Sequence, residues 1–271
     1  MQTHTHELTF TDTEVRKRYV TWDRGEADRE WGCLTVLADH APGVPPRPLR
    51  RETVAGAPVV VMERLPGIPL GGAPLAPSQT ESLGRALRQL YSVPLDAVHD
   101  VGIAERLHGP TTLPDSLREW LSDRYDLSQC QDPELVRAAV DHSLAWLAEF
   151  DGLPTPHLVA LGISDLNPTN VIWDGTTCRL VDFEDGGLTD PAYELADHVE
   201  HLAGRLGVVF TPAALVDAVR LSSAEQDRMR AYRPLWAGFW LVMLLPGNGG
   251  VRRNPPGTTE AQASHVMALL G

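Results

Sequence analysis

The sequence predicts an α+β protein with a small β-rich N-terminal part, residues 1–65, and a larger helical C-terminal part, residues 66–271. Two patterns support this division. Short alternating runs of β-branched and aromatic residues occupy the first part, whereas apolar residues with helical spacing recur in the second. The boundary is placed at Leu65-Pro66-Gly67, where proline and glycine interrupt both patterns.

The composition is typical of a globular protein that buries a sizeable core. Hydrophobic residues make up 43% of the 271 residues and charged residues 22%. The formal net charge of −13 disfavours nucleic acid and anionic membranes as partners and favours cationic ligands. The oligomeric state cannot be inferred from these features.

Cysteine usage and the N-terminus predict a cytoplasmic protein. Cys33, Cys130 and Cys178 are far apart and odd in number, which favours reduced thiols over disulfides or a zinc site. The first ten residues lack an apolar signal core, and the apolar run 235–245 is too short to cross a membrane.

The first predicted element is a hairpin over residues 7–20. In its second strand, alternation places Val15, Lys17 and Tyr19 on one face. Lys17 is the only lysine among 23 lysine and arginine residues, and it shares the more apolar face, where a cation needs a partner. A compact ammonium in a chain that otherwise uses arginine indicates a special site.

The next predicted element is a helix over residues 26–38. Glu30 falls in the middle of its apolar stripe, where a carboxylate is costly unless it is paired. We expect Glu30 to pair with Lys17, with Glu26 as the alternative partner.

The remaining elements follow from local signals. Residues 42–48 are expected to form a loop and residues 54–63 the next strands. Later helices are predicted to begin at Ser78, Asp132, Asp190 and Thr259, the first and last through capping boxes, and an apolar helix covers residues 236–245.

The chemically informative segment is residues 162–185. Two β-rich runs, 171–173 and 178–183, flank Asp174-Gly175, a strong hairpin signal. Folding this hairpin brings Asn170 close to Asp182, with Asp165 in the loop just before. Asp182 and Asn170 offer the hard oxygen ligands that Mg²⁺ prefers, and Asp165 can accept a proton from a substrate hydroxyl. The cluster therefore suits phosphoryl transfer.

These motifs resemble the aminoglycoside phosphotransferase family, which is related in fold to the protein kinases. The similarity runs over about residues 8–203 and rests on the Asp165–Trp173 and Leu180–Asp185 segments, on Val15–Tyr19, and on Val60–Gly67. The resemblance implies a bilobal kinase-like fold, with residues 1–65 as the nucleotide-binding lobe.

The resemblance also implies roles for individual residues. Asp165 would be the catalytic base, and Asn170 and Asp182 would hold Mg²⁺. Lys17 would steady the phosphates of ATP or GTP, positioned by Glu30, and the hinge residues Met62, Glu63 and Leu65 would bind the base. Glu184, Asp185 and Asp190 would face a small hydroxylated acceptor. The acidic charge favours a cationic acceptor such as an aminoglycoside, with choline-like and sugar acceptors left open.

Two departures from the family pattern support an alternative. Ile163-Ser164 stand where the family usually has His-Gly, and we expect the first strand and a glycine-rich phosphate loop to be missing from the N-terminal lobe. A non-catalytic, kinase-like binding protein is therefore the main alternative to a kinase. A third hypothesis is a nucleotidyl transferase that modifies proteins.

Several other polar residues are expected to be structural or solvent-exposed. Glu194, Asp197 and Glu200 are interpreted as a solvated helix face, and His198 and His201 as exposed helix histidines. His4 and His6 are interpreted as part of a tail. Trp236, Phe239 and Trp240 are expected in the core.

Overall fold

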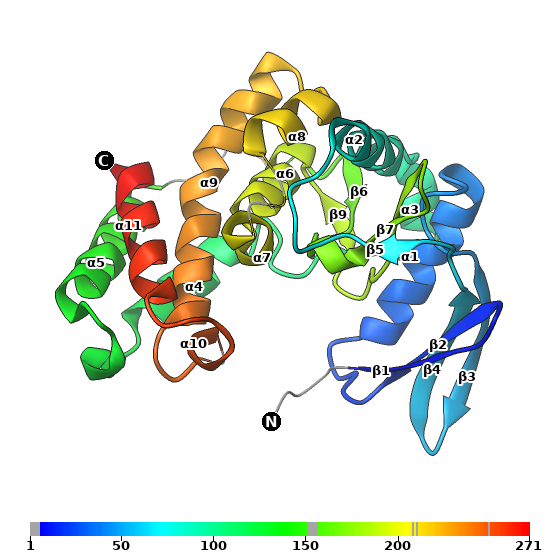
Figure 1. Ribbon diagram of the computed structural model, residues 1–271, viewed down its shortest axis with the longest axis horizontal. Coiled ribbons are helices and arrows are strands. Elements are labelled where there is room, and N and C mark those ends of the chain that lie inside the picture. The colour runs from blue at the N-terminus through cyan, green and yellow to red at the C-terminus, as the bar shows by residue number, and fades with distance from the viewer. Residues whose placement is uncertain (1–5, 151–156, 208, 210, 249) are drawn as a thin grey trace.

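The computed structural model describes residues 6–150, 157–207, 209, 211–248 and 250–271. A sheet and one helix form one end of the molecule, and helices α5 (Pro133–Glu149) and α11 (Thr258–Leu270) form the opposite end (Figure 1). The predicted α+β organisation is confirmed. None of the described helices combines the length and apolarity needed to cross a membrane.

The N-terminal sheet is antiparallel, with strand order β1-β2-β4-β3. Its strands are β1 (His6–Phe10), β2 (Glu14–Tyr19), β3 (Pro48–Val54) and β4 (Ala57–Glu63), and helix α1 (Glu26–His40) packs against β3 and β4. The predicted hairpin and helix are present. Strand β3 is not evident from the sequence, because an edge strand that contains Arg50-Arg51-Glu52 shows no apolar alternation.

The register of this sheet places the single lysine at its centre. Lys17 on β2 lies opposite Leu8 on β1 and Val60 on β4. Lys17 and Tyr19 are both buried, as the alternation predicts. The ammonium group is therefore held on a strand that is paired on both sides.

A short three-stranded sheet carries the chemically informative segment. It comprises β5 (Ile68–Pro69), β7 (Val171–Trp173) and β8 (Cys178–Leu180), in the order β5-β7-β8, preceded by the 3-10 turn η2 (Pro168–Asn170). The Asp174 carboxylate closes the hairpin by accepting backbone N–H bonds from Thr176 and Thr177, both at 2.8 Å. The turn predicted at Asp174-Gly175 is confirmed.

Gly67 joins the two sheets at a point where no side chain fits. Its φ is +117°, and a Cβ atom there would lie 2.3 Å from the backbone oxygen of Trp173. The linker can therefore pass directly over the hairpin and bring the end of β4 close to β7.

The rest of the C-terminal part is helical, with one small two-stranded sheet. The further helices are α2 (Pro77–Tyr91), α3 (Leu95–Asp100), α4 (Leu113–Ser122), η1 (Leu127–Gln129), α6 (Pro191–Glu200), α7 (Leu202–Leu206), α8 (Pro212–Val219), α9 (Ser223–Leu244) and α10 (Gly250–Arg253), and the strands are β6 (Ala160–Gly162) and β9 (Gly187–Thr189). Helix α6 packs against α9, β6 and α8, and all ten of its residues are buried.

The helix starts predicted from sequence are partly corrected. Asp132 and Asp190 cap α5 and α6, as expected. Helix α2 instead begins after Ala76, whose N–H donates to Gln79 Oε1, and α11 begins after Gly257. The Thr259 hydroxyl donates to Leu244 O, so it joins two helices rather than forming the predicted capping box.

Candidate active site

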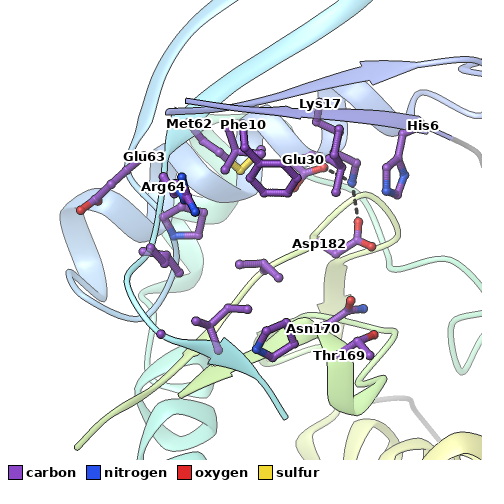
Figure 2. Close-up of a pocket in the computed structure, with 18 of the residues that line it drawn as sticks. His6, Phe10, Lys17, Glu30, Met62, Glu63, Arg64, Thr169, Asn170 and Asp182 are labelled. Atoms are coloured by element: carbon purple, nitrogen blue, oxygen red, sulfur yellow. Dashed lines mark hydrogen bonds and ion pairs between the residues drawn. The ribbon is translucent and has the colours of Figure 1, made fainter. Parts of the chain in front are cut away.

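A cleft of about 650 Å³ separates the N-terminal sheet from the β7–β8 hairpin (Figure 2). Its roof comes from β1, β2 and β4, its side from the linker after β4, and its floor from the loop and hairpin of residues 165–182. The lining includes Lys17, Glu30, Asp165, Asn170 and Asp182 together. Segments far apart in the sequence thus meet around one space.

Lys17 anchors an ionic cluster across this cleft. Its Nζ lies 2.5 Å from Glu30 Oε2 and 2.9 Å from Glu184 Oε2, and it also contacts Asp182 Oδ1. Burial alone would lower the pKa of the ammonium, but the charges of these three carboxylates outweigh that effect and raise it. Lys17 therefore stays protonated.

Glu30 is fixed by neighbours on both sides of the cluster. Tyr19 donates its hydroxyl hydrogen to Glu30 Oε2, and the backbone N–H of Phe183 donates to Oε1 at 3.4 Å. Glu26, the alternative partner for Lys17, instead accepts from Arg24 Nε at 3.0 Å. The expected Lys17–Glu30 pairing is the one that the structure contains.

Asp182 adopts an unusual backbone conformation, with φ +74°. A non-glycine residue in the left-handed region needs surrounding structure to hold it there. Burial raises the pKa of its carboxyl group, opposed by Lys17 and reinforced by Glu30 and Glu184. Because three carboxylates surround one ammonium, the cluster carries a surplus of negative charge that a divalent cation would neutralise.

The hairpin brings Asn170 next to Asp182 as predicted. The Val181 N–H donates to Asn170 O at 2.9 Å, which fixes the two strand ends side by side. The Asn170 Nδ2 group donates to the backbone oxygen of Asp165 at 3.1 Å, so its amide oxygen is left to face the cleft. An amide oxygen and a carboxylate are hard donors that fit Mg²⁺.

Asp165 lies at the junction of two cavities, because it lines both the large cleft and a second cavity of about 240 Å³. Its Oδ1 lies 2.8 Å from His201 Nε2 and accepts the Asn167 N–H at 3.1 Å. Partial burial in the cleft raises the pKa of the Asp165 carboxyl group, but the hydrogen bond and charge of His201 outweigh this effect, and the pKa is lowered. The carboxylate is therefore ionised at neutral pH.

The second cavity combines aromatic and charged side chains. It is lined by Arg24, Arg106, Leu107, His108, Ser164, Asp165, Asp185, Asp197, His201, Trp236, Phe239 and Trp240. Among the described residues, the indole nitrogens of Trp236 and Trp240 are buried without hydrogen-bond partners. Asp185 Oδ1 also lacks a hydrogen bond, although it lies 3.5 Å from the guanidinium of Arg24. Such groups are available to a bound ligand.

Comparison with known proteins identifies the family. The sequence profile of the phosphotransferase enzyme family matches residues 11–233. The chain belongs to this family. Comparison of this phosphotransferase with curated proteins yields no sequence match.

Solved structures confirm the kinase-like bilobal fold of this phosphotransferase. A choline/ethanolamine kinase family protein from Mesorhizobium loti has a TM-score of 0.65 at 17% identity, over 100% of this chain and 86% of that one. An aminoglycoside 2'-phosphotransferase-IIIa mutant in complex with GDP has a TM-score of 0.68 at 15% identity. The match covers 100% of this chain and 88% of that one. A choline kinase from Streptococcus pneumoniae has a TM-score of 0.62 at 16% identity. The match covers 100% of this chain and 90% of that one.

The structure places most of the predicted site residues of the phosphotransferase in one region. Met62, Glu63 and Leu65 line the large cleft, and Asp185 lines the second cavity. Asp190 lies outside the linings of both cavities. Its carboxylate caps α6 and pairs with Arg228 at 3.0 Å, a structural role.

Helix α6 requires the largest correction. Glu194, Asp197 and Glu200 are buried rather than solvated. Arg106 pairs with Glu194 at 2.5 Å and with Asp197 at 2.6 Å, and Glu200 pairs with Arg233 and with His265, each at 2.6 Å. These partners come from distant segments, which local sequence patterns do not reveal.

Three histidines lie elsewhere than the sequence predicts. His198 and His201 are buried, not exposed. His6 belongs to β1 and lines the cleft, with Nδ1 3.3 Å from Glu184 Oε2; with Asp182 these two residues form a group of metal-competent atoms lying within 4.8 Å of one another. His4 lies outside the described residues.

Proposed function

We propose that this phosphotransferase moves the γ-phosphoryl group of Mg-ATP or Mg-GTP to a hydroxyl group of a small molecule. The observation that supports this most directly is the position of Asp165. It stands where a cleft containing Lys17, Asn170 and Asp182 meets a second, smaller cavity. A donor site and an acceptor site would then share one proton acceptor.

The large cleft suits the nucleotide. Val15, Met62 and Ile172 offer apolar surfaces for the base, and the linker residues Glu63 and Leu65 lie at its edge. Lys17 is positioned to bind phosphate oxygens, and Glu30 keeps its ammonium in place. The base is therefore assigned to the apolar part of the lining and the phosphates to the charged part.

Asn170 and Asp182 are the residues that would hold Mg²⁺. The ion would supply charge neutralisation for the phosphate groups. Asp182 is ready for this role because its backbone is fixed by Glu30 through the neighbouring Phe183 N–H. The surplus of carboxylates around Lys17 is a further reason to expect a cation here.

Asp165 would accept the proton of the acceptor hydroxyl. Its lowered pKa keeps the carboxylate ionised, so that it orients the hydroxyl toward the nucleotide and takes its proton as transfer proceeds. The second cavity would hold the rest of the acceptor. The two indole N–H groups favour hydroxyl oxygens, and Asp185 and the aromatic faces add favourable contacts for an amine. Because Arg24 already lies beside Asp185, the preference for a cationic acceptor rests mainly on the net charge of −13.

A non-catalytic binding protein is the second candidate, because the phosphate-covering element is sparse. The β1–β2 connection is a tight turn in which Thr11 N–H donates to Glu14 O at 2.9 Å, and residues 6–19 contain no glycine. A turn of this kind presents few backbone N–H groups to phosphates. His6, Leu8 and Phe10 instead cover this side of the cleft.

The kinase and the non-catalytic binding protein would both bind nucleotide, so the first experiment measures nucleotide binding. We expect Mg-ATP or Mg-GTP at about 100 Kd to stabilise the fold by about 3 kcal/mol, measured as a rise in melting temperature. Replacing Asp182 with alanine should abolish the magnesium-dependent part of this shift. No shift with either nucleotide at millimolar concentration would contradict nucleotide use.

Phosphoryl transfer separates the two candidates from each other. We expect nucleotide consumption with a hydroxylated acceptor, found by screening amino alcohols, aminoglycosides and sugars. Asp165→Ala should lower kcat by about 100-fold or more with nucleotide affinity unchanged. Asp141→Ala, an exposed aspartate on α5, is the matched control. Nucleotide binding without transfer to any acceptor would favour the binding protein, and full activity of Asp165→Ala would exclude its role as the base.

A further inference from the structure

His201 occupies a break in the helical part of the chain, next to the candidate base. It is the single residue between α6 and α7, with φ −54° and ψ 122°. Only 5% of the residue is exposed to solvent.

The ring of His201 is held in one orientation. Nε2 lies 2.8 Å from Asp165 Oδ1, and Trp240 packs edge-on against the ring with centroids 4.7 Å apart. Nδ1 is buried and has no hydrogen-bond partner among the described residues. Because the Asp165 carboxylate can only accept, Nε2 of the ring carries a proton and donates it to Oδ1.

Asp165 depends on this contact because little else restrains its side chain. Its side chain is 49% exposed. Within the described part of the chain, His201 is the only side chain that hydrogen-bonds to the carboxylate; the other contact is the backbone N–H of Asn167, also to Oδ1. Both bonds reach Oδ1, so Oδ2 is left to face an acceptor.

The neighbouring charges do not provide the same restraint. Arg106 is engaged by Glu194 and Asp197, and Arg24 by Glu26. Ile163, two residues before the base, is buried, and its side chain carries no polar group that could reach the carboxylate. The loop is supported from α6 instead, since Glu194 Oε1 accepts the Ser164 N–H at 2.8 Å.

We propose that His201 is a positioning residue for phosphoryl transfer, which holds Oδ1 of Asp165 so that Oδ2 faces the acceptor hydroxyl. The inference rests on the proposed function, because it assigns a role within the same site. A carboxylate free to rotate would spend much of its time with neither oxygen aimed at the hydroxyl. A misplacement of about 1 Å in a reacting group can lower the rate about 100-fold.

Two substitutions of the same residue test the hydrogen bond. His201→Leu fills similar space without a donor, and His201→Gln places an amide N–H close to the position of Nε2. We expect His201→Leu to lower kcat by about 10- to 100-fold with the nucleotide KM changed less than about 2-fold. His201→Gln should recover most of the loss. His142→Leu, an exposed histidine on α5, is the control, and melting temperatures confirm that each variant folds.

A spectroscopic measurement tests the contact without any acceptor. With ¹⁵N-labelled histidine, NMR of the wild-type protein should show one ring, identified by its loss in His201→Gln, with a proton held on Nε2. In Asp165→Ala the proton should no longer be fixed at this nitrogen. A wild-type ring without a proton on Nε2 would overturn the proposal.

The kinetic outcomes distinguish this proposal from the proposed function. If the wild type transfers phosphoryl groups and Asp165→Ala does not, yet His201→Leu is fully active, only the positioning role is overturned. The same conclusion follows if Leu and Gln are equally impaired. If the wild type transfers no phosphoryl group to any acceptor, the proposed function fails, and the positioning role fails with it.

Discussion

At the scale of single residues, the site is organised around opposite charges with very limited access to water. Lys17 is 3% exposed and meets carboxylates from α1 and from the loop after β8. Removing one member of such a group leaves an uncompensated buried charge, which is costly. The cluster therefore fixes the position of the sheet relative to the hairpin.

We expect Lys17→Arg to lower kcat/KM for the nucleotide by about 100-fold, because a planar guanidinium cannot occupy the position of a compact ammonium among three carboxylates. The change keeps the charge, so the protein should still fold. Arg18→Lys, on the opposite face of β2, is the control and should leave kcat/KM unchanged. Full activity of Lys17→Arg in steady-state kinetics would show that a point charge is not needed here.

At the scale of elements, close helix packing holds the floor of the site. Helix α2 packs against α8 and against β8 of the hairpin. Gly84 lies at the α2–α8 contact, where a Cβ atom would fall 2.5 Å from Ala218 Cβ and 2.6 Å from its backbone. The helices can approach this closely only because residue 84 has no side chain.

We expect Gly84→Ala to lower the free energy of unfolding by about 1–3 kcal/mol, measured by urea denaturation, because the added methyl group forces the two helices apart. Helix propensity alone would predict a gain of about 1 kcal/mol for this change. A loss of stability would therefore confirm the close α2–α8 contact, and a gain would contradict it. Arg85→Ala, at an exposed neighbouring position of α2, is the control.

Elements with a local signature could be predicted from the sequence. The alternation around Lys17, the Glu30 position in the α1 stripe and the Asp174 turn depend on neighbours within a few residues. The structure contains all three features. The division at residue 65 and the roles of the site residues stay predictions.

What could not be predicted depends on distant partners. Helix α6 looks amphipathic and partly solvated in sequence, yet α9 and other elements cover it on every side. Its carboxylates are paired with Arg106, Arg233 and His265, and the His201–Asp165 contact spans 36 residues. A chain whose charges pair across the fold gives a misleading local pattern.

At the scale of the whole molecule, the buried ionisable groups make stability depend on pH. Burial lowers the pKa of His198 from the ordinary 6.5 to about 4, with smaller opposing effects from Glu194. As pH falls below 6.5, the unfolded chain takes up a proton that the folded chain does not. The contribution of neutral His198 to the free energy of unfolding is therefore fully present above pH 6.5 and is lost as pH falls toward 4.

We expect the stability of the wild type, relative to His198→Leu, to fall by about 2 kcal/mol between pH 7 and pH 5. Denaturant unfolding of both proteins at the two pH values measures this difference. Other buried groups, such as His108 and Asp197, are present in both proteins. Their pH-dependent contributions therefore cancel in the stability difference between the wild type and His198→Leu. A stability difference that does not change with pH would mean that the pKa of His198 is the same in the folded protein as in the unfolded chain.

The single lysine on the central strand β2 also gives the molecule one enzymatic cutting point. A protease specific for lysine has one internal target in this chain, the Lys17–Arg18 peptide bond. That bond is paired with β1 on one side and β4 on the other, so the protease gains access only when the sheet opens. The rate of this one cut would report how often the N-terminal lobe comes apart, and a bound ligand that bridges the lobe to the hairpin would slow it.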